Sequence, residues 1–514
     1  MSGIALNEDD SHYFYTRAGQ RLDADKVASW VDQYAGAQVK ELILNPNAMR
    51  TSYASKVWDP IWRGYDSNGK DGQSLLKSRP PEERKALRRW IHTAWQLHQD
   101  GIDPYRVWID RSRKKKISPW ISMRMNDLHF VDDEQAFLHS EFWRNNPQLR
   151  RVSYRFKEWE DKAFDYGRPE VRAHHLKLVK ELIERYDFDG LELDWMRFRR
   201  HFRPGYESEG VPILTAFMSR VRRLLDDAEQ KRGHKIKLGA RVPSRPATAV
   251  GLGMDGVTWA RKGLVDMLVV TPHYATIETD MPIELWQQLL DGTNVTLAAG
   301  LELHIRPYPP GICQENSLET ARGTAISFLD RGADRIYLFN YMDLEPGTAD
   351  ANLYASTAIG PRNYPLLLRE AGSIKVMARK PRRHVVTFSD TWAPGEPPTW
   401  AKDESRAALL PAFSLKNEWQ EFRVPIGPKP NSGKVIAVLG LLKSPAVKNK
   451  TLEVRINGEI CRFIGPIDLP KPAPNFPAYG FDVPLPAVKR GYNLIEVLSR
   501  EKVTFGWVEV KITP

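Results

Sequence analysis

The sequence predicts an α/β fold, a (β/α)8 TIM barrel followed by an antiparallel, jelly-roll-like β-sandwich. Residues 1–370 repeat a short apolar strand, a polar loop and an amphipathic helix about eight times, which is the count of a (β/α)8 barrel with long loops. From about Val385 the helical period disappears, and short strands are separated by Pro, Gly and Asn, as in a sandwich. The chain has 514 residues, too many for one ordinary core, so two or more domains are expected.

Eight segments have the length and apolar content of barrel strands. They are residues 3–7, 40–45, 120–126, 190–195, 236–242, 265–271, 295–302 and 335–341. Six further segments carry apolar residues at helical spacing, namely residues 25–34, 81–99, 169–185, 212–231, 283–290 and 317–331. Pro81, Pro169 and Pro212 are expected near helix starts, where a missing N–H costs nothing. An open doubly wound sheet is the alternative, but the first βα turn carries no GxGxxG and no GxxxxGK[ST] occurs.

The change of pattern predicts the domain limits. We expect the barrel over residues 1–375, a basic connector over 376–384 and the sandwich over 385–514. Residues 452–456, 493–498 and 504–512 are expected strands of the sandwich. We expect the sandwich to brace the barrel, because the connector that joins the two domains is so short.

Composition limits the classes of partner. Lys and Arg number 75 against 64 Asp and Glu, a net charge of +11, which favours nucleic acid, acidic polysaccharide or a membrane surface. No apolar run approaches the ~18 residues of a membrane helix, so no membrane partner is expected. MSGIALNEDD at the N-terminus lacks the segments of a signal peptide. We therefore expect a cytoplasmic protein, or a secreted or periplasmic one if the chain is a trimmed mature form. The two cysteines, Cys313 and Cys461, exclude a disulfide framework and a thiol metal site.

The rest of the chain is organised around residues 186–199, which read YDFDGLELDWMRFR. Alternate side chains of a strand point to opposite faces, so Glu192 and Asp194 share a face, while Leu191, Leu193 and Trp195 share the other. Burying charge without a partner is costly, which favours an active site or metal site here. An edge strand with a solvated face is the alternative.

Polar residues follow all eight predicted barrel strands. The active site of a barrel enzyme lies at the C-terminal ends of its strands, and a barrel with a purely structural role has no need of polar residues at every strand end. The candidate substrate-binding residues collected in this way are Arg124, Asn126, Asp127, His129, Arg197, Arg241, His273, Tyr274, His304, Arg306, Asn340 and Tyr341.

Two carboxylates on facing strands suit glycoside hydrolysis, in which one protonates the leaving oxygen and the other attacks the anomeric carbon or activates water. Asp194, at the end of the fourth strand, is the expected nucleophile. Glu302, at the end of the seventh strand, is the expected acid/base, because it shares a face with Gly300 and His304. Glu192 is expected to orient Asp194 or a sugar hydroxyl. The alternatives are ion pairs of Glu302 with Arg241 or Arg306, and of Glu192 with Arg124 or Arg241.

The motif DGLELDWM, residues 189–196, resembles the strand-four signature of glycoside-hydrolase barrels. It is similar to the DGxDxDxE of chitinase-type enzymes, with Asp189, Gly190, Glu192 and Asp194 at the first four fixed positions. The acid position of that signature holds Met196. The motif also resembles the α-amylase and α-galactosidase superfamilies, whose strand-four Asp is the nucleophile, which implies that role for Asp194. The resemblance rests on about ten residues and implies a glycosidase without specifying its substrate.

Arginines at or just past the strand ends predict an anionic substrate, a sulfated or uronate-containing polysaccharide, because Arg binds sulfate and carboxylate by paired N–H bonds. Equally, these arginines can be solvated or can neutralise the carboxylates of the site itself. The basic run of residues 111–116, RSRKKK, is expected to be a solvated surface loop. No nucleic-acid-binding motif is present, so nucleic acid is not the expected partner. The arginines in question are Arg124, Arg197, Arg199, Arg200, Arg203, Arg241, Arg245 and Arg306.

The sequence therefore predicts a glycoside hydrolase that cleaves an acidic polysaccharide or oligosaccharide with retention and without a cofactor. A metal-dependent hydrolase or lyase is one alternative, since His129, His273, His304 and Asp127 follow barrel strands, although HxH and HExxH are absent. A non-catalytic carbohydrate-binding barrel is the other alternative, because a fold alone does not define a function.

Overall fold

The computed structural model describes residues 2–155, 158–343, 359–396, 410–443, 447–448 and 451–514. Eight parallel strands close into a barrel in which each strand pairs with the next along the chain and the last pairs with the first. The predicted (β/α)8 barrel is thus confirmed, and every barrel strand ends within three residues of its predicted limits. The strands are β1 (Ile4–Glu8), β2 (Val39–Leu44), β3 (Ser118–Arg124), β4 (Gly190–Asp194), β5 (Lys237–Pro243), β6 (Met267–Thr271), β7 (Thr296–Leu301) and β10 (Arg335–Leu338).

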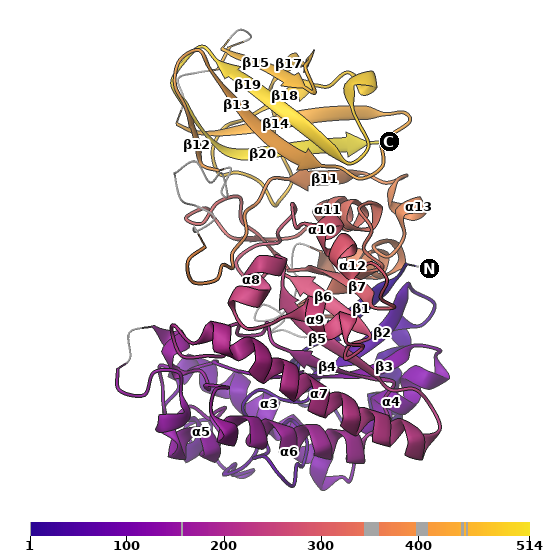
Figure 1. Cartoon of the computed structure of the whole chain (residues 1–514), viewed down its shortest axis with the longest axis vertical. Helices are drawn as coiled ribbons and strands as arrows, with labels where there is room; N and C mark the ends of the chain where they lie inside the picture. The colour runs from indigo at the N-terminus through magenta and orange to yellow at the C-terminus, as the bar shows by residue number, and fades with distance from the viewer. Residues whose placement is uncertain (1, 156–157, 344–358, 397–409, 444–446, 449–450) are drawn as a thin grey trace.

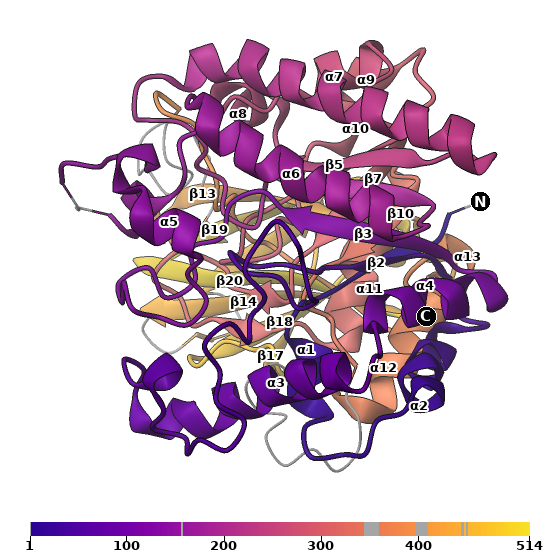
Figure 2. The same ribbon diagram turned by 90° about the horizontal axis from the view of Figure 1, so that it is seen from below.

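Helices surround the barrel, with α6 and α7 side by side along one flank and α1 and α3 on the opposite one (Figure 2). The longer helices are α3 (Pro81–Gln99), α4 (Pro104–Lys114), α6 (Pro169–Arg185), α7 (Glu207–Arg232), α10 (Ile283–Leu290), α11 (Leu318–Asp330) and α12 (Gly360–Glu370). The shorter ones are α1 (His12–Thr16), α2 (Ala24–Ser29), α5 (Glu141–Asn145), α8 (Pro246–Gly251), α9 (Gly256–Arg261) and α13 (Ile374–Met377). No helix in the described ranges is long and apolar enough to cross a membrane.

Two sequence predictions about helices are wrong. Pro212 does not mark a helix start, because α7 begins five residues earlier and contains it. The 111–116 run is not a loop, since its first four residues end α4, whose start is capped by the side chain of Asp103. Basic residues at a helix C-terminus complement the helix dipole. Here they also pair with carboxylates, Arg111 with Asp32 at 2.5 Å and Arg113 with Asp189 at 2.8 Å.

The lower interior of the barrel explains the glycine of the DGLELDW motif. The indole of Trp120 on β3 lies so close to Gly190 on β4 that a Cβ there would stand 2.2 Å from the ring. Trp120 packs among residues of five other strands, including Met267 and Tyr337. Gly190 therefore leaves room for one large side chain, the indole of Trp120, to fill the interior of the barrel.

The C-terminal part is a sandwich of two antiparallel sheets, as predicted. One sheet has the order β11-β20-β14-β18-β17 with β12 on β20, and the other has the order β13-β19-β15-β16. The first strand, β11, starts inside the predicted connector, so part of that segment belongs to the sandwich. Its strands are β11 (Arg382–Val385), β12 (Ala412–Ser414), β13 (Glu418–Pro425), β14 (Lys434–Lys443), β15 (Leu452–Ile456), β16 (Glu459–Ile460), β17 (Arg462–Pro466), β18 (Ala478–Asp482), β19 (Tyr492–Ser499) and β20 (Val503–Thr513).

The sandwich is stacked on the barrel, with α10 and α11 between them (Figure 1). A Cβ at Gly323 of α11 would lie 2.0 Å from the carbonyl oxygen of Arg383, so helix and strand are in direct backbone contact. An ion pair between Arg423 and Asp280, at 2.6 Å, also joins the two parts. This close contact lets the sandwich act on the geometry of the barrel.

The buried pair of Arg383 and Glu509, with atoms 2.6 Å apart and both side chains fully buried, predicts a stability effect. Arg383→Met leaves the Glu509 carboxylate buried and short of a counter-charge, so we expect a loss of about 3–5 kcal/mol in the free energy of unfolding. The measurement is urea denaturation, with hydrogen exchange at β20 amides to identify the transition of the sandwich. Arg462→Met removes an ion pair whose arginine is 77% exposed and should cost less than about 1 kcal/mol. Equal losses in the two variants would contradict the prediction.

Candidate active site

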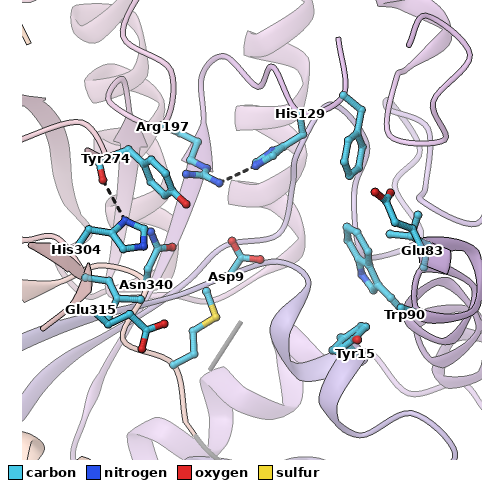
Figure 3. Close-up of a pocket in the computed structure, with 15 residues that line it drawn as sticks. Asp9, Tyr15, Glu83, Trp90, His129, Arg197, Tyr274, His304, Glu315 and Asn340 are labelled. Atoms are coloured by element: carbon cyan, nitrogen blue, oxygen red, sulfur yellow. Dashed lines mark hydrogen bonds between the residues drawn. The ribbon is translucent and has the colours of Figure 1, made fainter. Parts of the chain in front are cut away.

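A cavity of about 370 Å³ lies at the C-terminal ends of the barrel strands (Figure 3). Segments that follow β1, β3, β4, β6, β7 and β10 form one part of its wall, and one face of α3 forms the opposite part. The cavity thus occupies the position at which barrel enzymes bind their substrates. Its lining residues are Asp9, Tyr15, Glu83, Ala86, Leu87, Trp90, His129, Phe130, Arg197, Tyr274, Leu303, His304, Glu315, Asn340 and Met342.

Five residues singled out from the sequence line this cavity, namely His129, Arg197, Tyr274, His304 and Asn340. Several others lie beneath or beside the surface of the cavity instead. These are Asp194, Glu302, Glu192, Arg124, Asn126, Asp127, Arg241, His273, Arg306 and Tyr341.

Asp194, the last residue of β4, is almost fully buried, with 1% of its surface exposed. Its Oδ1 accepts the backbone N–H of Met196 at 2.8 Å and of Arg197 at 2.9 Å. Its Oδ2 accepts a hydrogen bond from Nη1 of Arg241 at 2.9 Å. Three donors, one of them cationic, therefore stabilise the carboxylate form of Asp194.

Glu302 follows β7 directly and is fully buried. Its Oε1 accepts N–H groups from Leu303 and from the amide of Asn340, each at 3.0 Å, while Oε2 has no partner among the described residues. Neither of the expected alternative ion pairs, with Arg241 or Arg306, is found within 4.0 Å in the described part of the chain. Burial raises the pKa of Glu302 to about 7, so this carboxyl group is extensively protonated near neutral pH.

Glu192 lies two residues deeper in the barrel than Asp194 and is also fully buried. It accepts hydrogen bonds from Ser122 Oγ at 2.7 Å and from the hydroxyl of Tyr337 at 2.8 Å. Burial and the charge of Asp194 raise its pKa to about 7. Its partners are therefore side chains of β3 and β10 inside the barrel, and neither of the expected alternative ion pairs, with Arg124 or Arg241, is found in the described part of the chain.

The strand register places Arg124, Asp194 and Arg241 side by side on β3, β4 and β5. Arg124 is 4% exposed and forms ion pairs with three carboxylates, those of Asp9, Asp10 and Asp127. Arg241 is fully buried above the ring of Phe339, at 3.7 Å. Both arginines thus neutralise carboxylates of the barrel itself.

Most arginines outside this layer behave in the same way. Arg199 and Arg200 pair with Glu160, Arg203 pairs with Asp165, and Arg245 pairs with Glu278. These contacts agree with the alternative given in the sequence analysis, in which the arginines neutralise the protein's own carboxylates.

Arg197 is different, because it lines the cavity and has no carboxylate within 4.0 Å among the described residues. Its Nη2 donates to Nε2 of His129 at 2.7 Å, and the other ring nitrogen of His129 bonds to Asp127 at 3.0 Å. Burial and the nearby charge of Arg124 lower the pKa of Arg197. With Nε2 facing Arg197 and Nδ1 facing Asp127, the ring of His129 links the two side chains.

The sequence analysis did not assign Asp9 to the site. Burial would raise the pKa of Asp9, but the charges of Arg124 and Arg197 outweigh it and hold the pKa well below its usual value. Asp9 is thus an ionised carboxylate that reaches the cavity, and Figure 3 shows it near the centre of the view, below Arg197.

The wall contributed by α3 was also missed. Glu83, Leu87 and Trp90 of α3 line the cavity. Their spacing of four and then three residues marks one helical face, and the sequence analysis predicted this helix without assigning it to the site. The sequence carries no sign that this helix lines the cavity.

The segment that follows β11 holds one wall of the cavity in place. The carboxylate of Asp390 accepts the backbone N–H groups of His273, Tyr274 and Ala275 at 2.8 to 2.9 Å. The ring of Tyr274 in turn contacts His304 edge to face at 4.8 Å. A residue that follows the first sandwich strand therefore fixes the loop after β6.

The three histidines proposed as metal ligands bond to different partners. His129 bonds to Asp127 and Arg197, His273 to Arg199, and His304 to the carbonyl of Tyr274. Within the described ranges, no group of three His, Cys, Asp or Glu side chains is arranged to hold a metal ion.

The remaining candidates have structural partners. Asn126 donates to the carbonyl oxygens of Phe164 and Arg200. Tyr341 donates to the carbonyl oxygen of Glu302, and Arg306 donates to that of Pro309.

No family model matches the sequence, and no curated protein matches it either. Among solved structures, a chitinase from Bacillus thuringiensis aligns with 99% of this chain and 100% of its own, at 9% identity and a TM-score of 0.38. An α-L-fucosidase from Paenibacillus thiaminolyticus aligns with 98% of this chain and 96% of its own, at 11% identity and a TM-score of 0.33. A cycloisomaltooligosaccharide glucanotransferase from Paenibacillus sp. aligns with 99% of this chain, at 8% identity and a TM-score of 0.33, and the chain spans 57% of its length. Likeness at this level defines neither a family nor an activity, so the functional argument rests on the geometry of the site.

The contacts of Asp390 predict a measurable change in the loop after β6. Asp390→Ala removes the acceptor for three N–H groups, so we expect the amides of residues 273–275 to exchange their hydrogens at least about tenfold faster. Hydrogen–deuterium exchange at these amides is the measurement. Arg423→Ala removes an ion pair between barrel and sandwich from the sandwich side, outside this loop, and it should leave the three amides unchanged. Faster exchange in both variants would assign the effect to general loosening of the interface.

Proposed function

We propose that this protein is a glycoside hydrolase in which Asp194 is the nucleophile and Glu302 is the acid/base. The observation that carries the proposal is the difference between the two carboxyl groups. Asp194 accepts hydrogen bonds from three donors, one of them a guanidinium, whereas Glu302 is buried, has a pKa raised to about 7 and keeps one oxygen without a partner among the described residues. Environments that separate two carboxyl groups in this way assign an acid and a nucleophile in glycosidases.

In the proposed reaction the protonated Oε2 of Glu302 donates its proton to the glycosidic oxygen as that bond breaks. Asp194 attacks the anomeric carbon, and the aglycone leaves as an alcohol. The Glu302 carboxylate then removes a proton from water, which attacks the anomeric carbon and releases Asp194, so the configuration is retained. Because the side chains of Arg197 and Asn340 line the cavity while the two carboxyls lie below its surface, productive binding includes displacement of these two side chains by the sugar.

The lining of the cavity fits a hydroxyl-rich ring. Trp90, Phe130 and Tyr274 offer aromatic surface for the apolar face of a sugar. Asp9, Glu83 and Glu315 offer carboxylate oxygens to its hydroxyl groups. These three carboxylates outnumber the one arginine of the lining, Arg197, so a neutral ring fits this cavity better than an anionic one, and the acidic group of an anionic polysaccharide belongs outside it.

Activity of catalytic variants is the first test of the proposal. After a screen of neutral, uronate-containing and sulfated polysaccharides identifies a substrate, Glu302→Gln should lower kcat by about 10²–10⁴-fold, the usual worth of a general acid. Asp194→Asn should abolish turnover. Glu184→Gln, at an exposed position of α6, is the matched control and should have no effect.

Other outcomes of this test would change the assignment. Turnover that survives Asp194→Asn but not Asp9→Asn would move the nucleophile to the carboxylate that reaches the cavity. Inhibition by EDTA would indicate a metal-dependent enzyme. Proton NMR of the first product determines whether the anomeric configuration is retained.

The pH dependence of the reaction gives a separate prediction. Glu302 acts as an acid only when protonated, so kcat should fall as the pH rises through about 7, the raised pKa of this group. Glu192 has a pKa in the same range, which makes Glu192→Gln the necessary control. The alkaline fall should persist in Glu192→Gln and disappear from the residual activity of Glu302→Gln. Persistence in Glu302→Gln would assign the fall to another group.

A further inference from the structure

A second cavity, of about 810 Å³, lies beside the proposed active site. Four cationic residues line it, namely Arg50, Arg63, Lys77 and Arg144, together with one carboxylate, that of Glu141. The carboxylate is already paired with Arg63 at 2.8 Å. The lining therefore carries an excess of positive charge, in contrast to the three carboxylates that line the first cavity.

Arg50 is the unusual member of this group. It is 3% exposed, yet none of its atoms lies within 4.0 Å of a carboxylate oxygen in the described residues. Its Nε and Nη1 donate to the carbonyl oxygens of His139 and Arg63, at 3.0 and 3.2 Å, while Nη2 has no hydrogen-bond partner in the same part of the chain. A buried guanidinium is normally paired, because desolvation of an unpaired charge is costly.

Two further donors stand around Arg50. Arg144 has a buried Nε without a partner among the described residues, and its Nη2 is held by the carbonyl oxygens of Gln135 and Ala136. Lys77 is exposed and has no ion pair in the described chain. Burial and the charge of Arg144 lower the pKa of Arg50 to about 10, a sign that these cations repel one another in the absence of an anion.

The two cavities share a wall. Arg79 follows Ser78 of the cationic cavity, and its guanidinium lies 3.9 Å from the ring of Phe130, which lines the proposed active site. Arg79 also pairs at 2.7 Å with Glu83, which lines the active-site cavity as well. Arg79 and its contacts therefore separate two neighbouring cavities.

We propose that the cavity around Arg50, Lys77 and Arg144 is an oxyanion-binding site that takes a sulfate or carboxylate substituent of the glycan bound in the neighbouring active site. Nη2 of Arg50 and the N–H groups of Arg144 that are not held by carbonyl oxygens are available for charge-assisted hydrogen bonds to these groups. Lys77 and the hydroxyl groups of Ser74 and Ser78 supply further donors. Binding of the anion stands on this geometry alone, whereas its identity as a glycan substituent rests on the proposed function.

The first test measures the free ion and needs no substrate. In thermal denaturation at constant ionic strength, exchange of sodium chloride for sodium sulfate should raise the Tm of the full chain, because a ligand of the folded state stabilises it. The double variant with Lys77→Ala and Arg144→Gln should lose most of this rise. Both substitutions are at positions that are not fully buried, so folding is retained. Lys177→Ala, in a separate cationic groove between α6 and α7, is the matched control and should keep the full rise. An equal rise in all three proteins would overturn the site.

The second test asks which oxyanion of a glycan is bound. Calorimetric titration uses sulfated dextran oligosaccharides, the same oligosaccharides after desulfation, and oligogalacturonates. The double variant should bind its preferred acidic ligand about tenfold or more weakly, as expected for loss of charge-assisted hydrogen bonds, with unchanged affinity for the neutral one. Preference for the sulfated or for the uronate ligand identifies the anion.

The two proposals fail separately. A sulfate-dependent Tm that the double variant loses supports the anion site even if no glycan is cleaved. Suppose instead that the double variant hydrolyses a glycan as fast as the unchanged protein and that sulfate has no effect on Tm. This result would support the glycosidase and overturn the anion site.

Discussion

The structure of the site depends on one constraint, the burial of three carboxyl groups around Arg241. Asp194, Glu192 and Glu302 all act electrostatically on Arg241, which is fully buried. Burial in a region of low dielectric constant disfavours the charged form of a carboxyl group, and at Glu192 the charge of Asp194 adds to this effect. Asp194 takes the hydrogen bond of Arg241, and the other two carboxyls have pKa values raised to about 7. The raised pKa of the proposed acid is thus a consequence of burial, which the charges of Arg241 and Arg197 offset only in part.

Strand register determines where the charged side chains of the site lie. Arg124, Asp194 and Arg241 are adjacent because β3, β4 and β5 are parallel and paired without a shift. A slip of one residue would turn Asp194 toward the helices and Trp195 into the barrel. The contact between Trp120 and Gly190 one layer below opposes such a slip, since no other residue leaves room for the indole. Packing of the lower barrel and chemistry of its upper end are therefore coupled through the same strand.

The barrel and the inward direction of Glu192, Asp194 and Glu302 were predictable because both depend on local periodicity, which the strand sequences carry. The partners of the arginines were not predictable in the same way. Arg124 lies 115 residues from one of its carboxylates, Asp9, and nothing local distinguishes an arginine that binds substrate from one that neutralises its own fold. Asp390 was missed because it follows the barrel in sequence yet reaches its mouth. The 111–116 run was wrongly predicted to be a loop because its charged side chains were assumed to be solvated. Instead these residues end a helix, which is capped by Asp103 at its start and held by ion pairs of Arg111 and Arg113.

The excess of positive charge in the composition has a different meaning in the folded protein than in the sequence. Arg124 and Arg241 are paired with Asp9, Asp10, Asp127 and Asp194, so they do not make the central cavity attractive to anions, and Arg197 stands there against three carboxylates. One wall away, the buried Arg50 belongs to a lining with four cationic residues, and among the described residues Arg50 has no carboxylate partner. A glycan with an uncharged ring at the point of cleavage and an acidic ring beside it satisfies both cavities at once. Under the two proposals, an anion held outside the centre leaves the pKa of Glu302 where burial and the protein's own charges set it.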